Sequence, residues 1–557
     1  MPAAWRPRAE WVLGTLLAGL GRRPRFTGDG GDAAVCALAY AARPVAEVPT
    51  VPLSRTALEL FAATAPLPPG SYARYETPAG ELPGAFPAAS PQPHGDTRRT
   101  LPAASPETAG FCAPFDLVAS SFVLLAAWDE RTHAERDRFG RLPFSASVFA
   151  ENPALSIDEP AVDRAAALLR AVLAPRLDEL GRPPLPPPGW MWRERGDAAD
   201  GAEGDGDAGA AGPGFAVALT HDVDNLWRWT RRGFAASGYR SLRGLRRLDP
   251  RPLAREAGDV AHWLTHHLPR RTDPYWTFPQ MLAGEDARGV DSTFFVIARH
   301  THRRDGNQPA VYQRRIPEVL SLLRRAGREV GLHGNDSDRL GVSPLNDDRK
   351  DLRARARDDV RGVRYHYLRC LYHETLPLVD AAGLDYDSSL AFAEHEGFRC
   401  GTALPFHPYL LAEERPLRLV ELPLVIMDTT LHQPQYRALA APAAEEAARA
   451  VLERVRAAGG AVALLWHNMR FDRRAAEGYD EVYWRLVDWV LAGGGTAGAA
   501  GAVVDRWRSA LGEDVFSAGI APPPCAGACA GAPRAGLTPA VAAPSGAPPS
   551  GAPGAAP

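Results

Sequence analysis

The part of the chain that most restricts the fold runs from about residue 214 to residue 513, where short apolar runs alternate with amphipathic segments. The apolar runs are typical of buried strands: FAVALT, STFFVIA, EVGLHG, LDYDSSL, LVELPLVI and AVALLWHN. Between them, residues 316–326 and 443–458 have the spacing of amphipathic helices. This alternation predicts a parallel β/α architecture, either a closed barrel or an open doubly wound sheet.

Polar side chains stand where these apolar runs end. Asp222 and Asp224 follow FAVAL, His333 and Asp387 lie within later runs, and His467 lies near the end of AVALLWHN. In barrels and in open sheets of parallel strands, the reactive groups gather at the carboxyl ends of the strands. We therefore expect a functional site built from several strand ends.

The pair Asp222 and Asp224 is the first candidate for chemistry. A single aspartate at such a position is typical of a turn or a helix cap. Two carboxylates at positions i and i+2 of an extended backbone point to the same side and can face one cavity. One of them would bind a cation while the other acts as a base.

Three further side chains suit this pair. His333 lies between Gly331 and Gly334, and we interpret these glycines as a tight turn that a ligand approaches, with a packed core histidine as the alternative. His467 would face the same edge and suits a general acid near neutral pH. Arg364 is either a surface charge or the partner that holds one carboxylate ionised.

Composition excludes several other kinds of chemistry. Lys350 is the chain's only lysine and follows Arg349, so there is no Gly-Lys-Ser/Thr phosphate-binding loop. The absence of a G-x-S-x-G motif argues against a serine esterase. The net charge of −3 argues against nucleic acid as a partner, and six scattered cysteines are too few for a disulfide framework. What remains is metal-assisted hydrolysis, in which a cation activates water, a carboxylate accepts its proton and a histidine protonates the leaving group.

Low-complexity stretches divide the chain into parts. We expect an N-terminal α/β domain at 1–190 with a surface insertion at 78–109, an acidic flexible linker at 194–213, the β/α domain at 214–513 and a disordered tail at 516–557. The apolar stretch from Trp11 to Leu20 lacks a small-residue cleavage site, so we expect an ordinary first helix. No run approaches the ~18 apolar residues of a membrane span, and we expect a soluble, cytoplasmic protein.

Five blocks of sequence, in one order, resemble a known family. They are T-H-D-x-D, F-F, G-L-H-G, D-S-S and L-x-W-H-N. Over about residues 212–513 they resemble the NodB-homology domain of the polysaccharide deacetylases, carbohydrate esterase family 4. The chain is most similar to a bacterial branch with a separate N-terminal domain, through R-x-H-Y-L-R, YDSSLAFAEHEGFRCGTALPF and FGRLPFSASVFAENPAL. The resemblance implies a distorted (β/α) barrel with an incomplete ring of strands.

The resemblance also implies roles for individual residues. Asp222 matches the family's catalytic base, Asp224 its metal-binding aspartate, His333 the first histidine of its metal motif and His467 its catalytic acid. Arg364 falls in the block whose arginine contacts the base. Tyr367 neighbours the backbone that stabilises the oxyanion.

The chain departs from the family at the metal motif. Ser337 stands where a second histidine is expected, and a serine hydroxyl is a poor zinc ligand. The candidates for the missing ligand are His366, which stands where the family has a proline, and Asp336 or Asp338, which would make an oxygen-rich site. We favour His366. The expected cofactor is a divalent metal, zinc first, with Mn, Mg or Co as alternatives; weak metal binding and action without metal stay open.

We therefore expect a metal-dependent hydrolase that removes N-acetyl groups from the sugars of a polysaccharide or glycan precursor. The alternatives are a catalytically inactive glycan-binding barrel, which Ser337 favours, and a metal-independent hydrolase of small cyclic amides. A glycosyltransferase that binds a metal–nucleotide at Asp222 and Asp224 would have no use for His333 and His467. The arginine-rich segment 228–255 is either a solvated helical face or a patch for an anionic glycan, a lipid-linked sugar or a membrane surface.

Overall fold

The computed structural model describes residues 4–22, 26, 38–42, 48–87, 98–99, 111–193, 214–228, 273–300, 305, 309–472 and 477–512. The expected linker and tail, most of the segment 228–255 and much of the expected insertion at 78–109 lie outside the described residues. Met1–Ile520 form one compact unit. The domain boundaries expected from the sequence stay a prediction.

The N-terminal region, residues 4–193, combines helices with two small sheets. Its elements are α1 (Arg6–Gly19), β1 (Ala39–Ala41), β2 (Thr50–Pro52), α2 (Arg55–Ala62), β3 (Ala73–Thr77), β4 (Gly80–Gly84), β5 (Arg98–Arg99), α3 (Leu117–Leu125), α4 (Trp128–Thr132), η1 (Phe144–Ala146), α5 (Val148–Glu151), α6 (Ala161–Glu179) and η2 (Trp190–Trp192). The predicted first helix is confirmed within α1, whose apolar side chains are buried. The strand β4 lies at the start of the expected insertion.

The rest of the described chain is built on one parallel sheet of nine strands. In pairing order they are β13 (Val420–Glu421), β10 (Tyr386–Asp387), β9 (Gly362–Tyr365), β8 (Glu329–Gly334), β7 (Thr293–Val296), β6 (Ala216–Val223), β15 (Ala461–Leu465) and β14 (Leu424–Met427), with β16 (Thr496–Gly498) also paired to β6. Every residue of β6 is buried, as expected for a central parallel strand covered on both faces. The predicted parallel β/α class is therefore correct.

The two ends of this sheet belong to one stretch of chain. Leu422 donates its backbone N–H to the carbonyl oxygen of Asp387 on β10 at 2.9 Å, while the Ala463 N–H of β15 donates to the carbonyl of Pro423 at 2.8 Å. The sheet thus curls into a distorted barrel. The prediction of a single strand over LVELPLVI is wrong, because Pro423 has no N–H to donate and the chain changes partner there.

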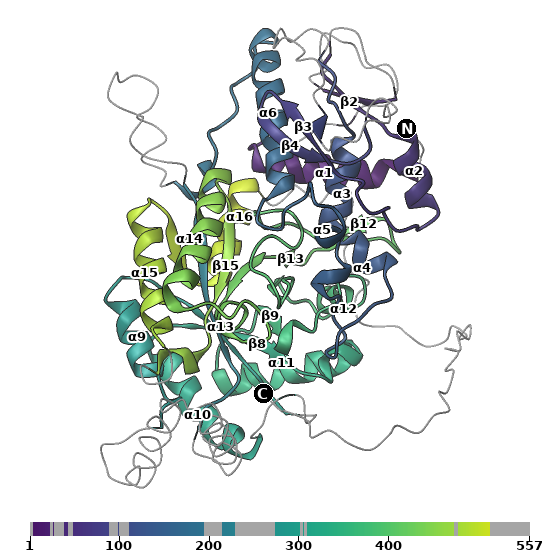
Figure 1. Cartoon of the computed structure of the whole chain (residues 1–557). Helices are drawn as coiled ribbons and strands as arrows, with labels where there is room; N and C mark the ends of the chain where they lie inside the picture. The colour runs from purple at the N-terminus through teal and green to yellow at the C-terminus, as the bar shows by residue number, and fades with distance from the viewer. Residues whose placement is uncertain are drawn as a thin grey trace, which may run out of the picture. The chain divides into compact units, whose positions relative to one another are not determined.

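Helices pack around the outside of the strands (Figure 1). They are α9 (Phe278–Asp286), α10 (Pro309–Arg325), α11 (Val342–Ala356), α12 (Thr375–Ala381), α13 (Asp428–His432), α14 (Ala441–Ala458), α15 (Tyr479–Ala492) and α16 (Ala500–Leu511), with short turns η5 (Asp338–Leu340), η6 (His366–Leu368) and η7 (Asn468–Phe471) and a hairpin of β11 (Tyr409–Leu410) and β12 (Arg415–Pro416). The predicted helix 316–326 lies in α10 except for its last residue, which follows the end of α10, and the predicted helix 443–458 lies within α14. Of the helices described, none is both long and apolar enough to cross a membrane.

The N-terminal region is joined to the barrel by polar contacts. Glu130 of α4 forms an ion pair with Arg399 and accepts a hydrogen bond from the backbone N–H of Tyr372. At another place, Arg8 of α1 pairs with Glu414 at 2.5 Å. Charged groups buried as deeply as Glu130 and Arg399 are tolerated only when paired, so these contacts fix specific partners across the boundary.

Candidate metal centre and catalytic site

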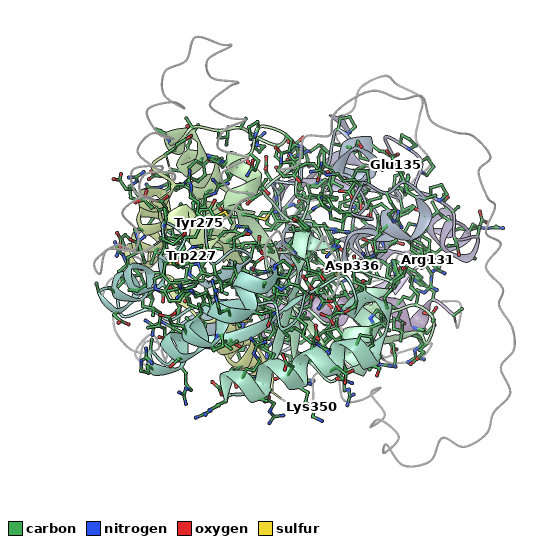
Figure 2. All side chains as sticks on the ribbon, turned by 90° about the horizontal axis from the view of Figure 1, so that it is seen from below. Arg131, Glu135, Trp227, Tyr275, Asp336 and Lys350 are labelled. Carbon is green, nitrogen blue, oxygen red and sulfur yellow. The ribbon has the colours of Figure 1, made fainter. Side chains whose placement is uncertain are left out.

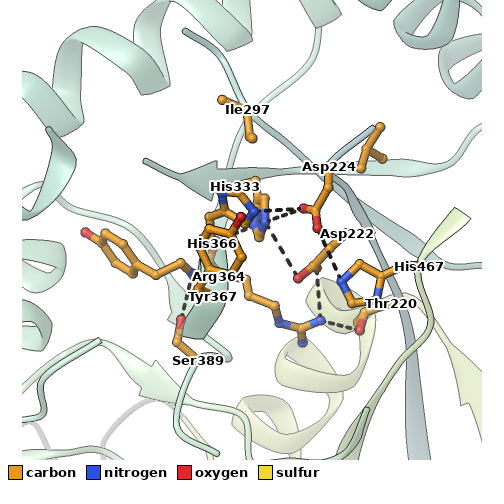
Figure 3. A network of polar contacts seen from close by, with 12 residues as sticks. Thr220, Asp222, Asp224, Ile297, His333, Arg364, His366, Tyr367, Ser389 and His467 are labelled. Carbon is orange, nitrogen blue, oxygen red and sulfur yellow. Dashed lines mark hydrogen bonds and ion pairs between the residues drawn. The ribbon is translucent and has the colours of Figure 1, made fainter. Parts of the chain in front are cut away.

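The predicted site residues meet at the carboxyl edge of the sheet (Figure 3). Asp222 is the last residue but one of β6, and Asp224 directly follows that strand. His333 and Arg364 are register partners on the neighbouring strands β8 and β9. His467 follows β15, on the other side of β6. The ends of β6, β8, β9 and β15 therefore converge; the sequence predicted three of these ends but not that of β9.

Asp224, His333 and His366 form a cluster with metal-binding chemistry. One ligand atom from each lies within 4.8 Å of the other two. The distance from Asp224 Oδ1 to His333 Nε2 is 3.1 Å, and to His366 Nε2 it is 3.6 Å. One carboxylate and two imidazoles are the donor set of a catalytic zinc site that keeps a position open for water. The residues present therefore fit the metal that the resemblance implied.

A hydrogen bond fixes the ring of His333. Its Nδ1 lies 2.8 Å from the backbone carbonyl oxygen of Arg364, which can only accept, so Nδ1 carries the proton. The lone pair of Nε2 is then free for a metal. The prediction that Gly331 and Gly334 form a ligand-facing turn is wrong: both lie in β8, and a Cβ at either position would collide with the ring of Phe295 or of Tyr365.

His366 is the third member of the cluster, in a chain that has Ser337 where a second histidine was expected. Burial lowers the pKa of His366, which favours the neutral imidazole that metal binding needs. The Ser337 hydroxyl instead donates to Asn335 Oδ1 at 2.7 Å. The competing candidates are engaged as well, because Asp336 pairs with Arg369 at 2.5 Å and Asp338 accepts the Asn335 N–H at 2.9 Å.

The predicted base, Asp222, is buried and held by an arginine. Arg364 Nη1 lies 3.4 Å from Asp222 Oδ1. The guanidinium is itself fully buried and donates to Thr220 Oγ1 at 2.6 Å, to the Ser388 carbonyl at 2.7 Å and to Ser388 Oγ at 2.8 Å. A guanidinium with this many partners cannot turn away, so it keeps the carboxylate of Asp222 oriented.

The predicted acid, His467, is hydrogen-bonded to a carboxylate that the sequence did not reveal. Asp428, the first residue after β14, lies 2.6 Å from His467 Nδ1, and its other oxygen accepts from Arg470 at 2.9 Å. Burial disfavours a charged imidazole, but the Asp428 carboxylate outweighs it and raises the pKa of His467 to about 9. His467 is thus protonated near neutral pH, with Nε2 facing Asp224 Oδ2 at 3.6 Å.

Asp224 lies at the centre of these groups. Burial opposes its ionisation, but the imidazoles around it, that of His366 first, hold its pKa well below the usual range. It is therefore an anion at all pH values of interest and is available to a cation. Asp387, also predicted at a strand end, has another role: it accepts the Ser389 N–H and hydroxyl, both at 2.8 Å, and so shapes the D-S-S turn.

Other sequence features fall outside this cluster. Lys350 is exposed on α11 and projects outward (Figure 2), which leaves no lysine for a Schiff base at the site. Among the described cysteines, Cys112, Cys370 and Cys400 are free thiols.

Residues 76–177, in the N-terminal region, match the family described as "Family of unknown function (DUF7033)". No curated protein matches the chain. Among solved structures, the chain is similar to a putative polysaccharide deacetylase from Mycobacterium smegmatis, at 21% identity and a TM-score of 0.35 over 54% of this chain and 91% of that one. The Puue allantoinase is similar at 13% identity and 0.35, over 54% and 93%. A CE4 family pseudoenzyme from Bacillus anthracis is similar at 12% and 0.27, over 52% and 66%.

Proposed function

We propose that this chain is a metal-dependent hydrolase of the polysaccharide deacetylase type, which removes N-acetyl groups from the sugars of a polysaccharide or glycan precursor. The observation that carries the proposal is the placement of an arginine-bound carboxylate, Asp222, and a carboxylate-bound imidazole, His467, on either side of Asp224. A binding protein needs neither a base nor an acid. Ser337 favoured an inactive barrel because a serine hydroxyl is a poor zinc ligand. His366 offers an imidazole in its place.

In the proposed reaction the metal ligands and the base have separate tasks. A divalent metal held by Asp224, His333 and His366 would polarise the acyl carbonyl and lower the pKa of a bound water. Asp222 accepts the proton of the attacking water, and Arg364 keeps its carboxylate oriented.

Collapse of the tetrahedral intermediate needs a proton on the leaving amine. His467 Nε2 supplies it, since Nδ1 is occupied by Asp428. The backbone at Tyr367 would stabilise the oxyanion, as the resemblance implies. The proposed substrate is an N-acetylated glycan or sugar precursor, and the proposed location is the cytoplasm.

Acetate release from N-acetylglucosamine oligomers tests this function. Protein stripped of metal by a chelator should release no acetate, and zinc, cobalt or manganese should restore release. Hydrolysis of a small cyclic amide that persists after chelation would favour the metal-independent alternative. Oligomer binding without any acetate release, by protein that holds metal, would favour the inactive barrel.

A further inference from the structure

A segment of the N-terminal region reaches the loop that carries His366. Arg141 Nη1 donates to the backbone carbonyl oxygen of Tyr367 at 2.7 Å. Arg141 is only 6% exposed, and Asp137 holds the same guanidinium at 2.6 Å and 2.9 Å. Asp137 therefore holds the guanidinium of Arg141 in place, and the carbonyl oxygen of Tyr367 has a rigid hydrogen-bond donor.

The loop that Arg141 holds has an unfavourable backbone conformation. Tyr367 and Leu368 have φ values of 58° and 55°, in the left-handed region that non-glycine residues seldom adopt. Such a conformation persists only where surrounding contacts determine it. The bond from Arg141 holds the peptide group between Tyr367 and Leu368. It therefore also holds the backbone of the loop that follows β9.

His366 lacks the hydrogen bond that usually orients a metal-binding imidazole. His333 has such a bond, whereas His366 Nδ1 is buried with no hydrogen-bond partner among the described residues. Stacked rings take its place. The ring of His366 lies against Tyr367 with centroids 3.9 Å apart, and the other face of the Tyr367 ring lies against Phe139 at 4.6 Å, both at an interplanar angle of 18°.

We propose that the segment 137–141 positions His366 for the metal, through the Arg141 bond to Tyr367 and the Phe139 ring. The N-terminal region, which includes the stretch matched by the family of unknown function, then completes the metal site of the barrel. Arg141 and Phe139 are positioning residues, because neither has a ligand atom in the cluster. The inference rests on the proposed function for the presence of a metal.

Cobalt(II) titration tests the inference without an activity assay, since the visible spectrum of bound cobalt reports the number and geometry of its ligands. The variants to compare with wild type are Arg141→Ala, Arg141→Lys and His366→Ala. We expect Arg141→Ala to weaken cobalt binding by about 10–100-fold, the usual effect of losing an outer-shell partner, and to shift the spectrum toward that of His366→Ala. Arg141→Lys keeps a donor for the carbonyl and should retain the wild-type spectrum.

Arg8→Ala is the matched control. It removes one arginine that also joins the N-terminal region to the barrel, but Arg8 and Glu414 touch none of the cluster residues. We expect Arg8→Ala to bind cobalt like wild type, even where its melting temperature falls as far as that of Arg141→Ala. Phe139→Leu should shift the spectrum in the same direction as Arg141→Ala, by less.

The outcomes separate this inference from the proposed function. Arg141→Ala with the wild-type spectrum and affinity overturns the inference and leaves the function standing. Equal loss of affinity in Arg8→Ala and Arg141→Ala also overturns it, since the effect is then one of general stability. Wild-type protein that binds cobalt but releases no acetate from glycan refutes the proposed function alone, and wild-type protein that binds no cobalt refutes both.

Discussion

Replacing Asp428 with asparagine should shift the alkaline limb of the pH dependence of kcat/KM to lower pH. The carboxylate 2.6 Å from His467 Nδ1 is the main group that raises the pKa of His467 to about 9 against the effect of burial. Because that pKa is raised, the protonated acid is present at lower pH and is lost as the pH rises through about 9. An amide in place of the carboxylate leaves the pKa near the ordinary ~6.5 or below it.

The size of the effect follows from these two values. At pH 8, an imidazole with a pKa of about 9 is about 90% protonated, whereas one with a pKa of about 6.5 is about 3% protonated. Asp428→Asn should therefore lower kcat/KM about 30-fold at pH 8 and hardly at all at pH 5.5. The assay is acetate release from N-acetylglucosamine oligomers across pH 5–10, with circular dichroism as the control for folding. An alkaline limb that stays in place in the variant would refute the role of Asp428.

Three further changes test other parts of the account. Asp222→Asn should abolish acetate release but leave metal content and fold intact, because an amide of the same shape cannot accept the proton; turnover within about tenfold of wild type would exclude Asp222 as the base. His467→Ala should lower turnover by roughly 10²–10⁴, and by less on activated acetyl esters, whose leaving groups need little protonation; equal losses on both substrates would indicate a structural role. Glu130→Ala leaves Arg399 buried without its partner and should lower the free energy of unfolding by about 3–5 kcal/mol in urea denaturation; a change below about 1 kcal/mol would contradict that contact.

The sequence predicted the sheet and most of the site because both depend on local patterns. A continuous apolar run marks a strand that is buried on both faces, as in β6. The carboxyl ends of parallel strands must then lie along one edge, so Asp222, His333 and His467 were expected to meet even though they lie far apart in the chain. Periodicity did not reveal β9, a short strand whose residues GVRY include the charged Arg364.

The parts that sequence patterns missed depend on contacts between distant residues. Asp428 follows the apolar run of β14, but its contact with His467 spans 39 positions of sequence. Arg141 contacts Tyr367 across 226 positions of sequence, and no pattern near either residue signals that contact. His366 was inferred only from a departure from a family motif. Its ring position depends on the stack with Tyr367, which a sequence does not display.

The central claim is that Asp224, His333 and His366 hold a catalytic divalent metal. His366 supplies the second imidazole, because Ser337 stands where the family has a histidine. Zinc titration of wild type, His366→Ala and Ser337→Ala measures this directly. We predict one tightly bound zinc per chain in wild type, an affinity unchanged within about threefold in Ser337→Ala, and a loss of more than about 100-fold in His366→Ala, since a lost ligand exceeds the effect of a lost outer-shell partner. His366→Ala protein that binds zinc as tightly as wild type, or wild-type protein that binds no divalent metal at micromolar concentrations, would contradict the account.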